Sequence, residues 1–157
     1  MNLGTKLKES GAKSMKEPLY GTYNPSIDSK GRMSFPTKLR DILGAEFYLC
    51  IGHDNSYIAV YSPEEFDKYC EKLQTITGEI GTALRRELLA GADKQVPDKQ
   101  GRIFLAQHLR EFAGITDEVT VVGALHKAEI WDTKTYQEVR GTVDPDAKKA
   151  ALAGMML

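Results

Sequence analysis

The stretch Asp28-Ser-Lys-Gly-Arg-Met-Ser-Phe-Pro-Thr-Lys-Leu-Arg40 decides the fold, because the chain contains it twice. It returns seventy positions later as Asp98-Lys-Gln-Gly-Arg-Ile-Phe-Leu-Ala-Gln-His-Leu-Arg110. Asp, Gly, Leu and two Arg coincide, whereas average residue frequencies would give about one identity in thirteen positions by chance. The same offset aligns Gly44 with Gly114. The sequence therefore contains an internal duplication.

Each copy of the motif is followed by two short runs rich in β-branched and aromatic residues, which are typical of a β-hairpin. The runs cover 47–51 and 57–61 in the first copy and 119–122 and 128–131 in the second. With the short helix expected over 37–43 in the first motif and its counterpart in the second, each copy is predicted to be a β-α-β-β-α unit. The predicted fold class is α+β, mainly β with flanking helices.

A helix is predicted directly after each hairpin. Ser62 and Asp132 are suited to cap the two helices, and an aromatic residue before each cap can pack one turn into the helix. A further helix is expected over 79–90, with Ile80, Leu84 and Leu88 on one side and the guanidinium groups of Arg85 and Arg86 elsewhere, towards solvent or a partner. For the end of the chain, a short weak helix and a frayed tail both remain open.

These signals divide the chain into segments. The first, 1–19, shows no periodicity and is expected to be a flexible tail or an artefact of the start site. The others are a first repeat with its helix at 20–75, a connecting helix at 76–93, a second repeat at 94–142, and a C-terminal tail or short helix at 143–157.

Composition places the chain among ordinary globular proteins. Apolar residues make up 41% and charged residues 27%, and the formal net charge is −1. No apolar run approaches the roughly 18 residues that a membrane span needs, so a protein of the cytoplasm is expected. Cys50 and Cys70 are expected to be buried thiols rather than a disulfide.

The motif concentrates positive charge on a tight turn. Gly31 can adopt a positive φ, and Asp28 can accept hydrogen bonds from backbone amides two residues on; Asp98 and Gly101 repeat this arrangement. Between positions 28 and 41, four basic residues oppose two aspartates, although the whole chain carries −1. Exposed Lys and Arg side chains on such turns would suit DNA phosphates and bases. The alternative is that Asp28 pairs with Arg32, and Arg40 with Asp41 or Glu46, in purely structural ion pairs.

Other chemistry finds little support in the sequence. His53, His108 and His126 have no companion ligands at metal-binding spacing, so no metal site is predicted. The pair Glu64-Glu65 occupies the first turn of a helix, where the helix dipole favours acidic residues. No nucleotide-binding loop or nucleophile elbow occurs. We therefore expect no enzyme, no catalytic residue, no cofactor and no small-molecule substrate.

The two motif copies at this spacing, together with the stretch Leu84-Arg-Arg-Glu-Leu-Leu-Ala-Gly-Ala92, resemble the MraZ family of bacterial proteins over about residues 20–140. The resemblance implies a pseudo-two-fold, swapped-hairpin, double-split β-barrel of the AbrB type. It also implies a nucleoid-associated transcription regulator of the division and cell-wall gene cluster, which assembles into a ring from octamer to dodecamer.

Carried over to this chain, the family's DNA-contacting loop maps to Lys30 and Arg32, with Lys99 and Arg102 as the second-copy residues. The hypothesis is a sequence-specific regulator that binds tandem operator repeats in double-stranded DNA. The alternative from another class is an AbrB-like oligomeric scaffold or an antitoxin-type module that binds a protein partner. Gel-shift experiments on promoter fragments would separate the two.

Overall fold

The computed structural model describes residues 17–156, so most of the expected tail at 1–19 lies outside the described residues. The last residue of that segment, Leu19, is part of the fold. Leu19 is buried in the core and forms an antiparallel bridge with Leu125, with its backbone nitrogen 3.0 Å from the Leu125 oxygen. The ordered fold therefore begins before the expected boundary at residue 20.

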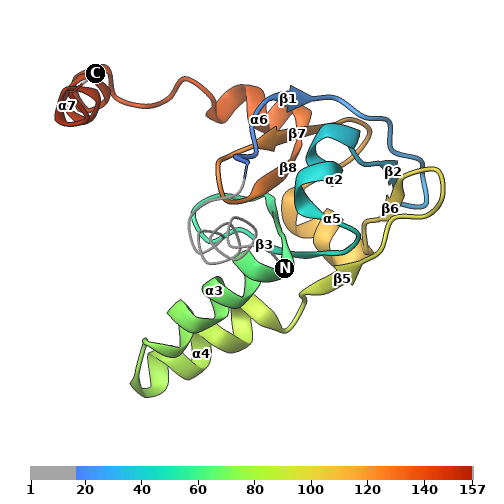
Figure 1. The fold of residues 1–157 in the computed structure, drawn as a ribbon, viewed down its shortest axis with the longest axis horizontal. Helices are drawn as coiled ribbons and strands as arrows, with labels where there is room; N and C mark the ends of the chain where they lie inside the picture. Colours follow the sequence, from blue (N-terminus) through green and yellow to red (C-terminus); the bar gives the residue numbers. More distant parts are fainter. Residues whose placement is uncertain (1–16, 157) are drawn as a thin grey trace, which may run out of the picture.

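The two repeats contain the same elements in the same order (Figure 1). The first comprises β1 (Thr22–Tyr23), β2 (Arg32–Ser34), α2 (Thr37–Leu43), β3 (Phe47–Ile51), β4 (Ile58–Tyr61) and α3 (Pro63–Gln74). The second comprises β5 (Asp93–Gln95), β6 (Arg102–Phe104), α5 (Gln107–Ala113), β7 (Val119–Gly123), β8 (Ala128–Asp132) and α6 (Thr133–Val139). Helix α4 (Gly78–Leu89) joins the repeats, and α7 (Pro145–Gly154) follows them.

This order confirms the α+β class but differs from the prediction in two respects. Each repeat begins with an additional short strand, β1 or β5, which makes it a β-β-α-β-β-α unit. Helices also occupy more of the described chain than strands, so the fold is mixed rather than mainly β.

All strand pairs are antiparallel, and the two repeats exchange strands with each other. A six-stranded sheet has the order β1-β7-β8-β4-β3-β5, and β2 and β6 form a separate two-stranded ribbon. The leading strand of each repeat pairs with the hairpin of the other, since β1 lies against β7 and β5 against β3. The contacts β4 to β8 and β2 to β6 also join one repeat to the other. Strands β1 and β5 are the edges of the larger sheet, so its six strands do not close into a barrel.

Hydrophobic side chains fill both faces of the sheet. On one face, alternate strand residues such as Leu49 and Val60 pack against Leu39 of α2, Leu109 of α5 and the inner side of the ribbon. On the other face, a cluster of mostly aromatic residues around Cys50, Tyr57 and Trp131 is covered by side chains of α3 and α6. The motif helices thus lie on the same side as the ribbon, and the main core holds the ribbon in place.

Local sequence chemistry accounts for the helix starts. The Ser62 hydroxyl accepts a hydrogen bond from the Glu65 backbone nitrogen at 3.2 Å, and Asp132 accepts one from the Thr135 nitrogen at 3.1 Å. The expected aromatic contacts across these caps are present, Tyr61 with Phe66 and Trp131 with Tyr136. These predicted caps and contacts are confirmed.

The connecting helix differs from its prediction in how its side chains are used. Leu88 is buried, but Ile80 is 62% exposed. Arg85 does not point to solvent or a partner, because its Nη1 donates to the carbonyl oxygens of Leu73 and Ile76 at 3.0 and 2.9 Å. It thereby satisfies carbonyl groups at and just after the end of α3, which a helix terminus otherwise leaves unpaired.

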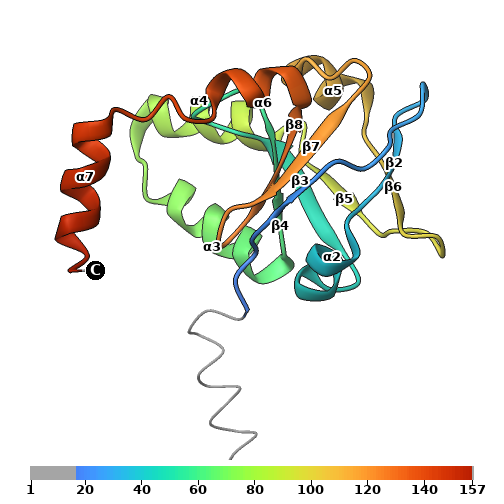
Figure 2. The same ribbon diagram turned by 90° about the horizontal axis from the view of Figure 1, so that it is seen from above.

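Helix α7 settles the open question at the end of the chain. The Asp144 side chain caps it by accepting a hydrogen bond from the Ala147 nitrogen at 2.9 Å, so this segment is a helix and not a frayed tail. No residue of α7 is buried, and the helix lies apart from the sheet at the end of an extended segment (Figures 1 and 2). None of the helices formed by residues 17–156 is long and apolar enough to cross a lipid bilayer.

Candidate nucleic-acid interface

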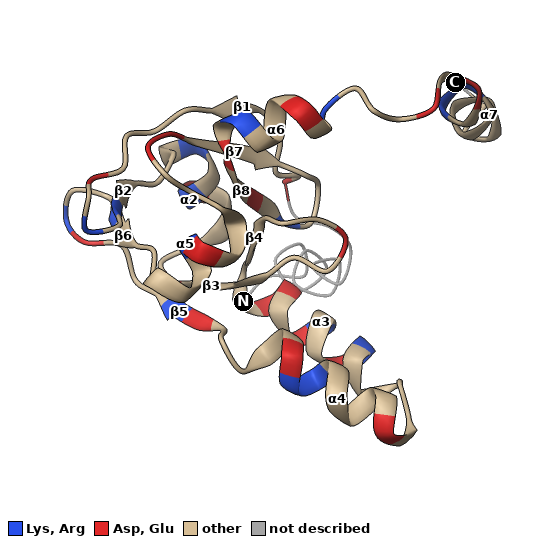
Figure 3. Cartoon of the chain, turned by 180° about the vertical axis from the view of Figure 1, so that it is seen from behind, with Lys and Arg blue, Asp and Glu red and all other residues tan. Residues whose placement is uncertain are grey.

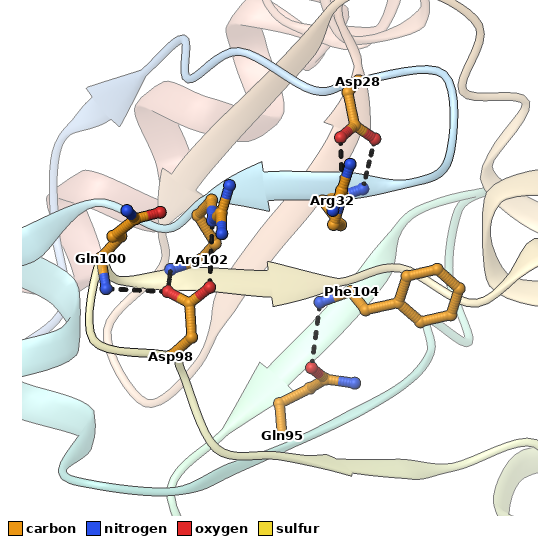
Figure 4. A network of polar contacts seen from close by, with 7 residues as sticks. All are labelled: Asp28, Arg32, Gln95, Asp98, Gln100, Arg102 and Phe104. Carbon is orange, nitrogen blue, oxygen red and sulfur yellow. Dashed lines mark hydrogen bonds and ion pairs between the residues drawn. The ribbon is translucent and has the colours of Figure 1, made fainter.

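Each turn before the ribbon is organised by one aspartate (Figure 4). Asp28 Oδ1 accepts hydrogen bonds from the backbone nitrogens of Lys30 and Arg32, both at 2.9 Å, while Oδ2 accepts one from Arg32 Nε at 2.8 Å. Asp98 makes the same three bonds, to the nitrogens of Gln100 and Arg102 at 2.9 Å and to Arg102 Nε at 3.0 Å. The two turns therefore share one hydrogen-bonding scheme.

The turn glycines are required by both conformation and space. Gly31 has φ of 96° and Gly101 has φ of 78°, a region that L-residues enter at a cost. A Cβ atom at Gly31 would lie 2.5 Å from the Leu105 carbonyl oxygen and 2.9 Å from Arg110 Nε. A Cβ atom at Gly101 would lie 2.8 Å from Cζ of Arg40. Each glycine thus makes room for the motif helix arginine of the other repeat.

The ribbon presents one buried and one exposed face. Met33 lies opposite Ile103, and both side chains are buried in the core. The exposed face holds Arg32 opposite Phe104 and Ser34 opposite Arg102. Because Arg32 and Arg102 each begin a strand and the strands are antiparallel, the two arginines lie at opposite ends of the ribbon.

The electrostatics of the turns keep the aspartates ionised. Hydrogen bonds from the backbone nitrogen of Arg32, and then from its guanidinium, hold the pKa of Asp28 below its ordinary value. Arg102 lowers the pKa of Asp98 in the same way. Figure 3 shows acidic and basic residues side by side on the loops before β2 and β6. Each arginine pairs through Nε, which leaves the terminal nitrogens of the guanidinium as further donors for a ligand.

The lysines of the two turns are exposed but do not occupy equivalent positions. The residue two positions after the turn aspartate, whose backbone nitrogen donates to that aspartate, is Lys30 in the first copy and Gln100 in the second. Lys99 lies one position earlier and corresponds to Ser29. Treating Lys99 as the counterpart of Lys30 is therefore wrong in register, although both place an ammonium group on a turn.

The pairing part of the ion-pair alternative holds for Arg32 and not for Arg40, and a pair with Asp28 does not by itself exclude a DNA contact by Arg32. Arg32 and Asp28 do pair, but Arg40 donates to the Thr37 hydroxyl at 3.2 Å, and Glu46 pairs with Lys94 at 3.1 Å. Sequence reasoning missed the role of Arg40 and Arg110 in covering the turn glycines of the opposite repeat. The signal was available, because both arginines are among the identities between the two copies.

The remaining candidates acquire structural roles or none. His108 Nε2 lies 2.9 Å from the Gly91 oxygen, and His126 Nδ1 lies 3.8 Å from Glu65 Oε1. Within the described range 17–156, no three His, Cys, Asp or Glu residues are grouped as metal ligands would be. Both cysteines are free, as expected, but only Cys50 is buried and Cys70 is half-buried. Burial raises the pKa of the Cys50 thiol to about 12, which suppresses thiolate chemistry.

The geometry of the ribbon suits a duplex groove. A two-stranded ribbon fits the major groove of B-DNA, where arginine can form paired hydrogen bonds to guanine. Here the backbone is fixed by the main core on one side and by the aspartate bonds at each end. The arginines can therefore face a ligand without any change in the fold.

Comparisons with known proteins agree with this pattern of repeats. The model of the MraZ protein family, which is described as antitoxin-like, matches residues 19–83 and 88–151. The chain is 40% identical over 141 residues to the transcriptional regulator MraZ of Corynebacterium efficiens, covering 87% of this chain and 98% of the relative. It is 38% identical over 140 residues to that of Acetivibrio thermocellus, covering 88% and 97%. With both repeats matched, the chain belongs to the MraZ family.

Proposed function

We propose that the protein is a sequence-specific DNA-binding transcriptional regulator that uses the exposed face of the β2–β6 ribbon. The observation that carries this proposal is the placement of Arg32 and Arg102 at the two ends of a rigid ribbon. Relatives are named transcriptional regulators, which points to duplex DNA as the partner. The proposed operators are tandem repeats upstream of the division and cell-wall gene cluster. The proposed location of the protein is the cytoplasm, in association with the nucleoid.

Within this proposal the eight residues of the two turns have three separate tasks. Arg32 and Arg102 contact base edges or phosphates, and Lys30 and Lys99 attract phosphates. Asp28, Gly31, Asp98 and Gly101 shape the turns. Because the net charge is −1, nonspecific attraction to DNA is weak for one subunit, and affinity depends on several subunits engaging together.

The finer architecture that we propose is the swapped-hairpin, double-split barrel of the AbrB type. Its support is the exchange of leading strands, in which β1 joins the second hairpin and β5 joins the first. The ribbon of β2 and β6 would complete the barrel above the larger sheet.

We also propose assembly into a ring, from octamer to dodecamer. Apolar side chains remain exposed on α4 and α7, among them Ile80 and Leu152, and a neighbouring subunit would cover them. Light scattering at micromolar concentration should report a mass several times 17.4 kDa; a mass of about 17.4 kDa would contradict the ring.

A second candidate is an AbrB-like scaffold or antitoxin-type module that binds a protein. The description of the family as antitoxin-like favours it, as do the exposed apolar residues of α7. It makes no use of the exposed ribbon arginines, so DNA binding separates the two candidates.

The test is a gel-shift titration against duplex DNA taken from directly upstream of the protein's own gene. A scrambled duplex of equal length and composition is the control DNA, and Lys134→Ala is the control protein, since Lys134 is exposed on α6, away from the ribbon and from the proposed subunit contacts on α4 and α7. We expect a ladder of complexes on the upstream DNA at concentrations that leave the scrambled DNA free. Equal binding to both duplexes, or to neither, would contradict sequence-specific regulation.

A further inference from the structure

The exposed face of the ribbon departs from the symmetry of the two repeats at one pair of positions. Ser34 and Phe104 are equivalent, each two residues after its turn arginine. Because of the antiparallel register, Arg32 lies opposite Phe104, whereas Arg102 lies opposite Ser34. One end of the ribbon therefore combines a guanidinium with an aromatic ring, and the other combines a guanidinium with a hydroxyl.

The phenyl ring is not part of the core. Phe104 is 47% exposed and lies on the opposite side of the ribbon from the buried Ile103. The fold does not need an aromatic residue here, because the same backbone position in β2 carries serine. Leaving such a side chain in water forgoes the free energy that burial of apolar surface provides.

The backbone of Phe104 is held in place from below. Its nitrogen donates to Gln95 Oε1 at 3.1 Å, as Figure 4 shows, and Gln95 is itself buried. Gln95 Nε2 in turn donates to Asp93 Oδ2 at 2.6 Å. On the neighbouring residue, the Leu105 nitrogen donates to the Gly31 oxygen at 2.7 Å. The ring is therefore presented outward by a fixed strand.

We propose that Phe104 contacts the C5-methyl group of a thymine in the major groove, beside the base or phosphate that Arg32 contacts. This inference rests on the proposed function. Directly opposed side chains on a ribbon have Cβ atoms about 5 Å apart, and neighbouring bases on one DNA strand are about 3.4 Å apart. A residue opposite an arginine can thus reach an adjacent base pair, and phenylalanine is suited to the thymine methyl group.

The contact gives the two ends of the ribbon different specificities. The Arg32 end would prefer a thymine next to the arginine-contacted position, and the Arg102 end would not, because Ser34 offers no comparable apolar surface. The site preferred by one ribbon is then asymmetric, although the turns that frame it are alike.

The test compares upstream duplex DNA with the same duplex in which deoxyuridine replaces every thymidine. This replacement keeps base pairing and removes the C5-methyl groups. Binding is measured for the intact oligomer of the wild type, of Phe104→Ser, and of Ser34→Ala as the matched variant at the equivalent position. The melting temperature of each protein is recorded, so that a loss of folding in Phe104→Ser is distinguished from a loss of the contact.

We expect wild type and Ser34→Ala to bind the uracil duplex about fourfold more weakly than the thymine duplex for each contact. This factor corresponds to the free energy of burying one methyl group. Phe104→Ser should bind both duplexes equally, at about the weaker affinity. Equal binding of both duplexes by wild type, or unchanged discrimination in a folded Phe104 variant, overturns the inference while leaving DNA binding intact. Failure of wild type to prefer upstream over scrambled DNA instead overturns the proposed function, and this inference with it.

Discussion

The two turns of the ribbon share one backbone conformation and hydrogen-bonding scheme but carry different exposed side chains. Both are built from an aspartate with three hydrogen bonds and a glycine at positive φ. They differ in the residue two positions after the turn aspartate, Lys30 against Gln100, and in the exposed strand residue, Ser34 against Phe104. The residues that shape the turns and the two turn arginines repeat, whereas the exposed residues beside them vary.

The arginines that cover the turn glycines also differ between the copies. Arg110 Nε donates to the Leu105 oxygen at 2.9 Å. Arg40 Nε is buried without a hydrogen-bond partner among residues 17–156. Backbone closes both turns, because the Leu105 nitrogen donates to the Gly31 oxygen at 2.7 Å and the Phe35 nitrogen donates to the Gly101 oxygen at 3.0 Å. The copies differ in whether the Nε of the covering arginine is hydrogen-bonded.

The largest expected effect comes from separating the repeats. Residues 20–92 expressed alone lose four strand pairings to the second repeat, those of β1 with β7, β2 with β6, β4 with β8 and β3 with β5. We expect this fragment to be poorly folded or to self-associate, because an isolated small unit with unpaired strands builds too little core. Circular dichroism and light scattering check this. A monomeric fragment with a sharp thermal transition would show that the strand exchange is dispensable.

The next effect distinguishes the two turns. Gly31→Ala and Gly101→Ala both force alanine to a positive φ, at a cost of about 1 to 2 kcal/mol in the free energy of unfolding. Gly31→Ala should cost more, because its Cβ atom meets a backbone oxygen at 2.5 Å, while that of Gly101→Ala meets the end of the Arg40 side chain. Urea unfolding of both variants measures the difference. Equal losses would mean that the backbone oxygen near Gly31 gives way as easily as the Arg40 side chain near Gly101.

The smallest effect is a dependence of stability on pH that the two turns should share. Folding lowers the pKa values of Asp28 and Asp98, so their contribution is complete above the ordinary carboxyl pKa of 3.8 and is lost as pH falls through the folded values. The double variant Asp28→Asn/Asp98→Asn should therefore show a shallower loss of melting temperature between about pH 5 and about pH 2. Each single variant should account for about half of the change. An acid profile identical to that of wild type would show that the aspartate bonds add nothing to stability.

The sequence was informative wherever structure depends on near neighbours. The helix starts at Ser62 and Asp132 follow from caps that bond three residues ahead. The duplicated motif located both turns, because Asp28, Gly31 and Arg32 lie within five residues and form one turn together. The register of the lysines was available too, because the constant offset of seventy aligns Lys30 with Gln100 and Lys99 with Ser29.

What could not be predicted depends on contacts between distant segments. Strands β1 and β5 have two and three residues, too few for a period, and exist because the other repeat's hairpin supplies their hydrogen bonds. Arg85 of α4 donates to carbonyl oxygens at and just after the end of α3, which belong to residues 9 and 12 positions earlier in the chain. Arg40 reaches a glycine in the other repeat. Sequence patterns within one element carry no information on these pairings.

The central claim is that the exposed ribbon arginines bind DNA, and the double variant Arg32→Ala/Arg102→Ala tests it most directly. Affinity for the upstream duplex, its salt dependence, the melting temperature and the oligomer mass are measured on the same preparations of variant and wild type. If the arginines read guanine, each lost contact should cost roughly 1 to 3 kcal/mol and preference over scrambled DNA should fall. If they touch phosphates, affinity should fall for all sequences and the salt slope should shrink by about one per contact.

In either case we predict a variant with the mass of wild type and much weaker DNA binding. The contrary result is a variant that melts at a lower temperature, since the pairs with Asp28 and Asp98 are gone, yet binds the upstream DNA as wild type does. That outcome would confine Arg32 and Arg102 to a structural role and contradict the ribbon as the DNA-binding surface.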